Sequence, residues 1–163
     1  MERFAPDSAV IPWGFETEDI KIRMLTIHDL VKDYDAVMSS IDHLKGTFGP
    51  SDPWPPDDLT LEQDLIDLGW HQAEFQMRNS FAYTVMNLDE SRCLGCVYVN
   101  PSEKAGYDAN VILWVRQSEI RTGLDDKLFS AIRIWLPQEW WFTTVAFPGR
   151  KLSWHEWESL PDK

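Results

Sequence analysis

The pattern of hydrophobic and polar positions first indicates a strand and then a helix. The run "IKIRML" alternates apolar and polar residues and places Ile20, Ile22 and Met24 on one face, as in a half-buried strand. Apolar residues then recur at helical spacing from Ile27 to Leu44, behind Thr26 as the expected N-cap. The sequence therefore predicts a first strand followed by one long amphipathic helix.

A second helix is predicted after the proline-rich stretch "GPSDPWPPDD". That stretch suits neither helix nor central strand, so we expect an extended surface loop that Trp54 pins down. Thr60 and Gln63 form a capping box at the start of the helix, and Gly69 is a position where it bends or ends. Its expected inner face consists of Leu61, Leu65 and Leu68.

Three strand-like runs follow, "FAYTVMN", "CLGCVYVN" and "ANVILWV". They are separated by the turn segments "LDESR" and "PSEKAGYD", which predicts an antiparallel meander. A third helix should follow and end at Pro137, before a last strand in "TTVAF". The apolar face of this helix is expected to hold Leu124, Leu128, Ala131, Ile132 and Trp135.

The predicted order is strand, helix, helix, three strands, helix, strand. This order indicates an α/β fold with a mixed, mostly antiparallel sheet flanked by helices, whose last two strands run parallel around a crossover helix. The length suits a single domain, 1–163, with an N-terminal arm, 1–17, and a C-terminal tail, 150–163. We expect the arm to pack through Trp13 and Phe15, and the tail to add a helical turn at "SWHEWESL".

Composition narrows the classes of partner. A formal net charge of −12 argues against nucleic acid and anionic membranes and favours solubility or a basic partner. The first residues contain no signal-peptide core and no run approaches a membrane span, so a cytoplasmic location is expected. Cys93 and Cys96 lack the further ligands of a zinc site, and we expect two buried, reduced thiols on opposite faces of a strand.

Seven of the nine tryptophans fall into two groups. Three lie in patterns that predict a core position: Trp70, Trp114 and Trp135. Four lie in irregular or terminal segments, where they pack loops onto the domain or, alternatively, line a pocket for a cationic group or a subunit contact: Trp13, Trp54, Trp154 and Trp157.

The stretches "SRCLGCVYVNP" and "VILWVRQSEIRTGLDDKLFSAIRIWL", together with the element order, resemble the GNAT superfamily of acyl-CoA-dependent N-acetyltransferases. The resemblance covers Ile20 to about Gly149 and implies acetyl-CoA as cofactor. In that family a loop Q/R-x-x-G-x-G/A before a helix holds the pyrophosphate of coenzyme A through backbone N–H groups. The contacts that the resemblance implies here are Leu113, Trp114, Val115, Arg116, Arg121, Thr122, Gly123 and Leu124.

The loop departs from the family pattern. Ile120 stands at the Q/R position, Gly123 at the first glycine and Asp125 at the second, so only Gly123 agrees. A carboxylate at about 4 Å from a phosphate costs about 4 kcal/mol at an effective dielectric near 20, although arginines facing the ligand offset it. The offsetting candidates are Arg116, Arg121 and Arg150. The alternative is that this segment is only a well-capped crossover helix.

The resemblance implies an N-acyltransferase that moves an acetyl group from acetyl-CoA to an amine acceptor, either a small molecule or a protein. The alternative is an inactive GNAT-like binding module for a small ligand or a basic protein. The family often uses a tyrosine acid in the last helix, but the tail has no tyrosine, and the candidate catalytic residues are Tyr98, Asn110 and His155. His28, His43 and His71 show no metal-ligand spacing and receive no role.

The acceptor cleft is the least defined part of the expected site. The family's usual final hairpin is missing after the fifth strand, so one side of the cleft must be closed by the proline-rich loop, by the tail or by a second copy of the chain in a homodimer. An aromatic site surrounded by acidic residues would suit an amine.

Overall fold

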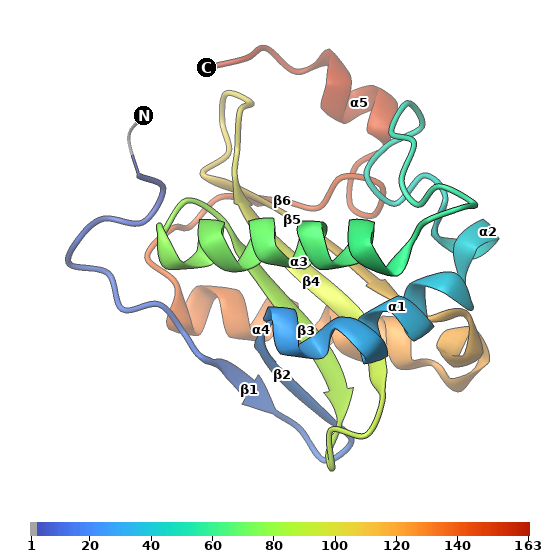
Figure 1. The fold of residues 1–163 in the computed structure, drawn as a ribbon. Helices are drawn as coiled ribbons and strands as arrows, with labels where there is room; N and C mark the ends of the chain where they lie inside the picture. The colour runs from blue at the N-terminus through green and yellow to red at the C-terminus, as the bar shows by residue number, and fades with distance from the viewer. Residues whose placement is uncertain (1–2) are drawn as a thin grey trace.

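The computed structural model describes residues 3–163, which form a six-stranded sheet with helices on both faces. The strands are neighbours in chain order, and every pairing is antiparallel except that of β5 with β6. Figure 1 shows α1 and α3 in front of the sheet and α4 behind it. The strands are β1 Gly14–Glu16, β2 Ile20–Met24, β3 Phe81–Asn87, β4 Cys93–Pro101, β5 Ala109–Val115 and β6 Val145–Ala146. The helices are η1 Ile27–Asp29, α1 Leu30–Met38, α2 Ile41–Leu44, α3 Leu61–Gln76, η2 Gln117–Thr122, α4 Leu124–Glu139 and α5 Trp154–Ser159. The predicted fold class is confirmed.

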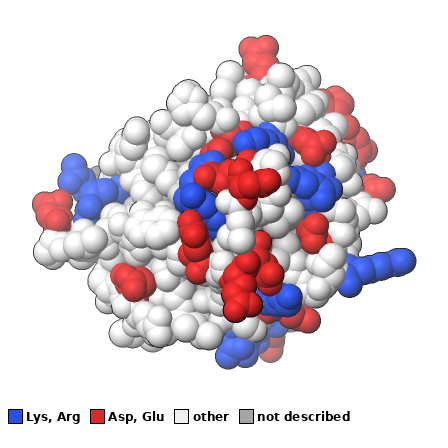
Figure 2. All heavy atoms as spheres, turned by 90° about the horizontal axis from the view of Figure 1, so that it is seen from below, with Lys and Arg blue, Asp and Glu red and all other residues white. Residues whose placement is uncertain are grey.

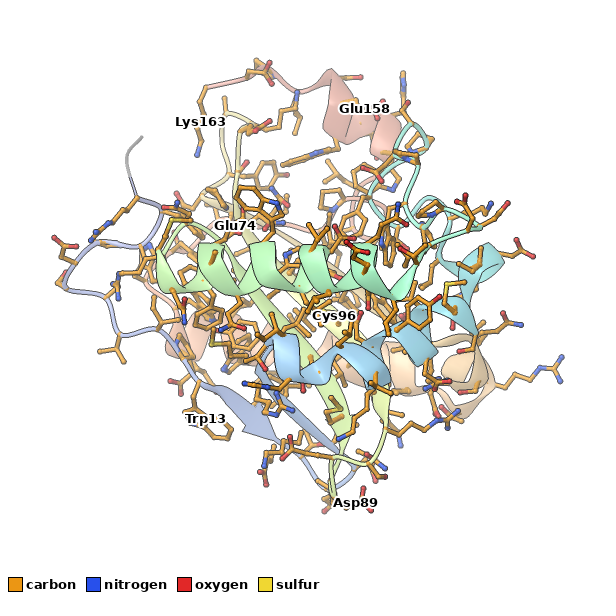
Figure 3. The ribbon with its side chains drawn as sticks, viewed as in Figure 1. Trp13, Glu74, Asp89, Cys96, Glu158 and Lys163 are labelled. Carbon is orange, nitrogen blue, oxygen red and sulfur yellow. The ribbon has the colours of Figure 1, made fainter. Side chains whose placement is uncertain are left out.

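Strand β1 lies in the segment that the sequence predicts as an arm. It pairs with β2 from Gly14 opposite Arg23 to Glu16 opposite Lys21. Phe15 packs on Trp135, with ring centroids 5.1 Å apart, as expected. The expectation for Trp13 is wrong, because its side chain is 62% exposed and points outward in Figure 3. Three residues are too few to show an alternating pattern, so the sequence missed this strand.

The prediction of one long first helix is wrong in one respect, since the helix is interrupted between α1 and α2. Two serines at the break bond to backbone groups, which competes with helical pairing. Ser39 Oγ donates to Ala36 O (3.1 Å), and the buried Ser40 Oγ accepts from the N–H of Gln117 (2.9 Å). The N-cap at Thr26 is confirmed, within a capping box that opens η1.

Helix α3 begins with the predicted capping box of Thr60 and Gln63 but continues through Gly69 to Gln76. Its buried face differs from the prediction. Leu61 and Leu65 are exposed and Trp70 is 63% exposed, whereas Leu68 is buried as expected. The residue four positions before Leu68 is Asp64, and this carboxylate is buried in place of a leucine.

Each face of the sheet has its own hydrophobic core. The α4 face buries Leu124, Leu128, Ile132 and Trp135 against the strands, as predicted. The opposite face packs residues of α1 and α3 against β3, β4 and β5. Pro137 does not end α4, which runs to Glu139. A proline in the last turn removes only one backbone donor, and the N–H of Trp140 still reaches Leu136 O (3.1 Å).

A bulge in β4 changes the orientation of the two cysteines. Val85 of β3 lies opposite Gly95, but the next residue, Met86, lies opposite Cys93, so Leu94 is left out of the pairing between these strands. Cys93 and Cys96 therefore both face the α1 and α3 side, and Figure 3 labels Cys96 in the middle of the molecule. Both are free and buried as predicted, but the expectation of opposite faces is wrong.

The C-terminal part confirms one predicted element and shortens another. Helix α5 begins at a capping box formed by Ser153 and Glu156. The last strand keeps only Val145 and Ala146 of the five residues expected. None of the helices formed by residues 3–163 combines the length and the hydropathy that a membrane span needs.

Acidic and basic side chains alternate at the end of the sheet that carries the β3–β4 turn (Figure 2). Arg23 contacts the carboxylates of Asp29 and Glu90, and Lys21 lies 3.1 Å from Glu90. The strongly negative net charge therefore does not form a continuous acidic surface at this end.

Candidate active site

The divergence of β5 from β6 opens a groove at the edge of the sheet. The two strands pair only at Ala109 with Val145 and at Asn110 with Ala146, after which the chain turns away. The resulting groove has a volume of about 280 Å³. We call it the β5–β6 groove, and its lining consists of His43–Thr47, Ile112–Val115, Asp125, Pro148–Arg150 and Trp154.

Side chains occupy the β5 carbonyl groups that a neighbouring strand would otherwise bind. Arg150 Nη2 donates to Leu113 O (3.2 Å), and His43 Nε2 lies 3.0 Å from Val115 O, so the proton on that nitrogen makes the hydrogen bond. His43, to which the sequence assigned no role, is therefore part of the groove. Because these partners are side chains, a ligand can replace them without breaking the sheet.

Asp125 and Arg150 form a bidentate ion pair beside the groove. The two terminal guanidinium nitrogens, Nη1 and Nη2, each lie 2.7 Å from a carboxylate oxygen of Asp125, and the guanidinium carbon lies 5.1 Å from the Phe129 ring centroid. Such a pair is geometrically specific and neutral as a whole. The repulsion expected between Asp125 and a pyrophosphate is therefore largely offset within the protein itself.

The predicted cofactor contacts do not all line the same cavity. Leu113, Trp114 and Val115 line the β5–β6 groove. The guanidinium of Arg116 is buried and occupied, donating to Cys93 O (3.0 Å), Asp35 (3.0 Å) and Ser39 Oγ (2.9 Å). Arg116 is therefore not positioned to offset Asp125, and this expectation is corrected.

The turn before α4 is partly closed on itself. Gly123 has φ +79°, a left-handed conformation that glycine adopts without steric cost. The N–H of Leu124 bonds to Thr122 Oγ1 (3.3 Å), and both of these residues line a separate depression beside Asp19. Arg121 is exposed and lines another depression. Among the arginines predicted to offset the repulsion, Arg150 is the one that contacts Asp125.

A second cavity lies on the α1 and α3 face of the sheet. It has a volume of about 230 Å³ and is bounded by α1, α3, β4 and the proline-rich loop. We call it the acidic pocket. Its polar and aromatic lining residues are Asp33, Asp52, Asp64, Asp67, His71, Phe48, Trp54 and Tyr98.

Two carboxyl groups of the acidic pocket are almost completely buried. Asp33 is 5% exposed and Asp64 is 2% exposed. Burial, followed by the charge of Asp64 and a hydrogen bond with it, raises the pKa of Asp33 well above its ordinary value. Burial likewise raises the pKa of Asp64 to about 6. The two carboxyl groups therefore favour a state in which they hold a proton between them.

The other titratable groups of the pocket respond to the same environment. Burial raises the pKa of Asp67 and lowers the pKa of His71. A histidine with a lowered pKa is neutral at pH 7, so its imidazole can accept a proton. Burial also raises the pKa of the Tyr98 hydroxyl, which keeps that group protonated.

Aromatic side chains form the wall between the two cavities. Trp114, which lines the β5–β6 groove, donates from Nε1 to the Tyr98 hydroxyl (3.1 Å). The ring centroid of Trp114 is 6.0 Å from that of Trp54, and the ring centroids of Phe48 and Tyr98 are 5.1 Å apart. Trp54 pins the proline-rich loop as predicted. This aromatic wall makes the groove and the acidic pocket neighbours.

The three predicted catalytic residues have different positions. Tyr98 lines the acidic pocket. The amide of Asn110 donates to Pro101 O (3.2 Å), and His155 is exposed on α5. Within residues 3–163, no hydrogen bond joins any two of these three side chains. Their catalytic roles stay predictions.

The sequence missed the acidic residues and His71, although it contained a signal. Asp33 lies between Leu30 and Val37 of a helix predicted to be amphipathic, and Asp64 lies four residues before Leu68. An aspartate at a core position of a helix is unusual and costly unless it has a partner or a function.

Replacing Asp64 with asparagine should stabilise the protein at high pH. The unfolded aspartate ionises near the ordinary pKa of 3.8 and the folded one at a pKa of about 6, so the folded state binds more protons between these values. The free energy of unfolding of the wild type therefore falls as pH rises through this window. We expect Asp64→Asn to raise the free energy of unfolding by roughly 1 to 3 kcal/mol at about pH 8, and by much less at about pH 4.

Thermal unfolding at both pH values measures this effect. Glu62→Gln, on the exposed side of the same helix, is the matched control and should change the melting temperature little at either pH. An equal loss of stability at both pH values in Asp64→Asn would contradict the assignment of a strained carboxyl group.

Structural comparison places the fold among acetyltransferases. The ribosomal-protein-S5-alanine acetyltransferase from Vibrio fischeri is 18% identical, with a TM-score of 0.58 over 75% of this chain and 66% of that one. RimL, a ribosomal L7/L12 α-N-protein acetyltransferase in complex with coenzyme A, is 14% identical, with a TM-score of 0.59 over 72% and 63%. MccE, a microcin C7 self-immunity acetyltransferase in complex with acetyl-CoA and AMP, is 15% identical, with a TM-score of 0.57 over 81% and 71%.

The fold is that of the GNAT acetyltransferases, as the sequence predicted. The chain spans 66% and 63% of the two ribosomal-protein acetyltransferases, just under two thirds of their length. No protein-family model and no curated protein sequence matches it.

Proposed function

We propose that this protein is an N-acetyltransferase that binds acetyl-CoA in the β5–β6 groove. The observation that carries this proposal is the divergence of β5 and β6 beside the first turn of α4, which opens a groove at the sheet edge. RimL and MccE, which share the fold, were solved with coenzyme A and acetyl-CoA. In the GNAT family such an opening receives the pantetheine arm of the cofactor.

Residues of the groove suit the parts of this cofactor. The carbonyl groups of Leu113 and Val115 lie on the edge of β5, where an amide of an extended ligand can bond in place of a strand. The Arg150 guanidinium suits a phosphate, because its planar donors match two phosphate oxygens. The first turn of α4, whose Asp125 lines the groove, adds the positive end of the helix dipole.

When bound, acetyl-CoA would supply an activated acetyl group. In the transfer, the acceptor nitrogen forms a bond to the thioester carbonyl carbon, the C–S bond breaks, and the thiolate of coenzyme A leaves. The proton released by the ammonium must pass to a base, and the thiolate must gain one. The acceptor class that we propose is an amine, either a small molecule or a protein.

The Asp125–Arg150 pair yields a direct prediction. In the wild type, a phosphate must compete with Asp125 for Arg150. Asp125→Asn removes the negative charge and leaves Arg150 available, so it should tighten acetyl-CoA binding by about 1 kcal/mol, a roughly fivefold change. Isothermal titration calorimetry at low salt measures the affinity, and the gain should shrink as salt is added.

Asp126→Asn is the matched control, because it makes the same change of charge one residue further along, at an exposed position outside the groove. Its effect should be clearly smaller. Weaker binding in Asp125→Asn would refute the proposed role of the pair, and failure of the wild type to bind acetyl-CoA would refute the enzyme assignment. Binding without release of free thiol in the presence of amines would favour the alternative, a GNAT-like binding module.

A further inference from the structure

The acidic pocket carries more negative charge than its surroundings neutralise. Four aspartates line it, and no lysine or arginine of residues 3–163 is part of its lining. If Asp33 and Asp64 hold one proton between them, one negative charge remains on this buried pair, next to the half-buried Asp67 and the exposed Asp52. A ligand with two positive charges would balance the buried pair and Asp67 together.

One atom in the pocket lacks a donor. Asp64 Oδ2 is buried, and apart from the proton that Asp64 can share with Asp33, no N–H or hydroxyl group in the described part of the chain donates to it. A buried acceptor without a donor is costly, and a charged donor gains the most from meeting it. A ligand ammonium would supply this donor together with the missing positive charge.

The aromatic lining completes the chemistry of the site. Phe48, Trp54 and Tyr98 present apolar faces along the pocket. Such faces contact methylene groups and attract cations. The volume of about 230 Å³ corresponds to roughly seven or eight water molecules, which is room for a short aliphatic chain with its end groups. Described residues form no cluster suited to a metal ion, so an organic cation is the better match.

We propose that the acidic pocket binds a short aliphatic diamine or polyamine through Asp64 and Asp33, and that this amine is the acetyl acceptor. The assignment of the acceptor rests on the proposed function, whereas binding of the amine does not. The position of the pocket supports both parts, because it lies next to the β5–β6 groove and shares with it the aromatic wall of Trp54, Trp114 and Tyr98. The acceptor nitrogen would form the bond to the acetyl carbon as the C–S bond of the donor breaks, and its proton would pass to a base.

Calorimetric titration with diaminobutane, without acetyl-CoA, tests the binding. Butylamine has the same chain with one charge, and butanediol has the same length with none. We expect the diamine to bind about tenfold or more tightly than the monoamine and the diol not to bind. Asp64→Asn should weaken diamine binding by about tenfold or more, whereas Glu62→Gln, exposed on the same helix, should leave it within about twofold.

Binding should also release protons near pH 6, because a bound cation favours the ionised form of the buried carboxyl groups. Repeating the titration in buffers with different ionisation enthalpies measures the number released. The groups that face this pair or shift its titration are Asp29 of η1, Asp52 of the loop, Asp67 and His71 of α3, and Tyr98 of β4. Asp64→Asn should abolish most of the proton release, which a loss of packing alone would not do.

The outcomes separate this inference from the proposed function. If acetyl-CoA binds but the diamine binds no better than butylamine, the inference fails and the acetyltransferase assignment stands. If the diamine binds and acetyl-CoA does not, the pocket is confirmed as an amine site and the enzyme assignment fails. Tighter binding of a divalent metal salt than of the diamine would also overturn the inference. Should Asp64→Asn unfold, Asp67→Asn provides the second test of the same site, with the same direction expected.

Discussion

Leu128→Ala is expected to lower the free energy of unfolding by roughly 2 to 5 kcal/mol. Leu128 lies in the middle of α4 and is fully buried between that helix and the sheet. Truncation removes apolar surface from the core and leaves a cavity, because neighbours on a rigid sheet relax only in part. Denaturant unfolding followed by circular dichroism measures the change.

Ile134→Ala on the same helix is the control. Ile134 is 61% exposed, so its truncation removes little buried surface and should change the free energy of unfolding by less than about 0.5 kcal/mol. If the two variants lost similar stability, the assignment of the buried face of α4 would be wrong.

Gly95→Ala is expected to cost about 3 kcal/mol or more. A Cβ atom at this position would lie 2.1 Å from Trp114 O and 3.1 Å from Val115 Cα, which are backbone atoms of the paired strand β5. Only a shift of one strand against the other can relieve this overlap, and overpacking of this kind costs most where no side chain can move aside. Because Trp114 belongs to the aromatic wall, the same shift should also disturb ligand binding in both cavities.

Gly69→Ala is the matched control for this change. Gly69 lies inside α3, where the nearest atom to an added Cβ is Ile27 Cγ2 at 4.0 Å. Alanine is the better helix former, so this variant should gain roughly 0.5 to 1 kcal/mol. The two substitutions should thus change the melting temperature in opposite directions, and a neutral result for Gly95→Ala would contradict the close approach of β4 and β5.

Local patterns in the sequence predicted most of the elements. The strand-like runs Phe81–Asn87 and Ala109–Val115 have the predicted bounds, and the capping residues Thr26 and Thr60 mark two helix starts as predicted. These features depend on residues within a few positions of one another. Such local signals are the ones that a single sequence carries most directly.

Errors arose where distant residues decide the structure. The break after α1 depends on Ser40 bonding to the N–H of Gln117, and the bulge at Leu94 depends on pairing with β3. Neither partner can be identified from local spacing. Cys93 was assigned to the wrong face of the sheet because regular alternation was assumed through Leu94.

Only part of the candidate site could be predicted, because the rest depends on distant residues. Leu113, Trp114 and Val115 follow from the strand pattern and the family resemblance, and they line the groove. The acidic pocket combines α1, α3, β4 and the proline-rich loop, so its composition required the tertiary structure. The pairing of Asp125 with Arg150, 25 residues apart, likewise offsets much of the repulsion expected from that aspartate.

The shortness of β6 has a consequence for association between molecules. A sheet edge with unpaired carbonyl groups is a surface on which a strand of another chain can add, and polymerisation follows when this repeats. Along β5, His43 and Arg150 already bind two such carbonyl groups, and the charged Asp125–Arg150 pair lies beside them. The opening in which we propose that a ligand binds is thereby protected from a second polypeptide, so the protein can keep a gap in its sheet without aggregating through it.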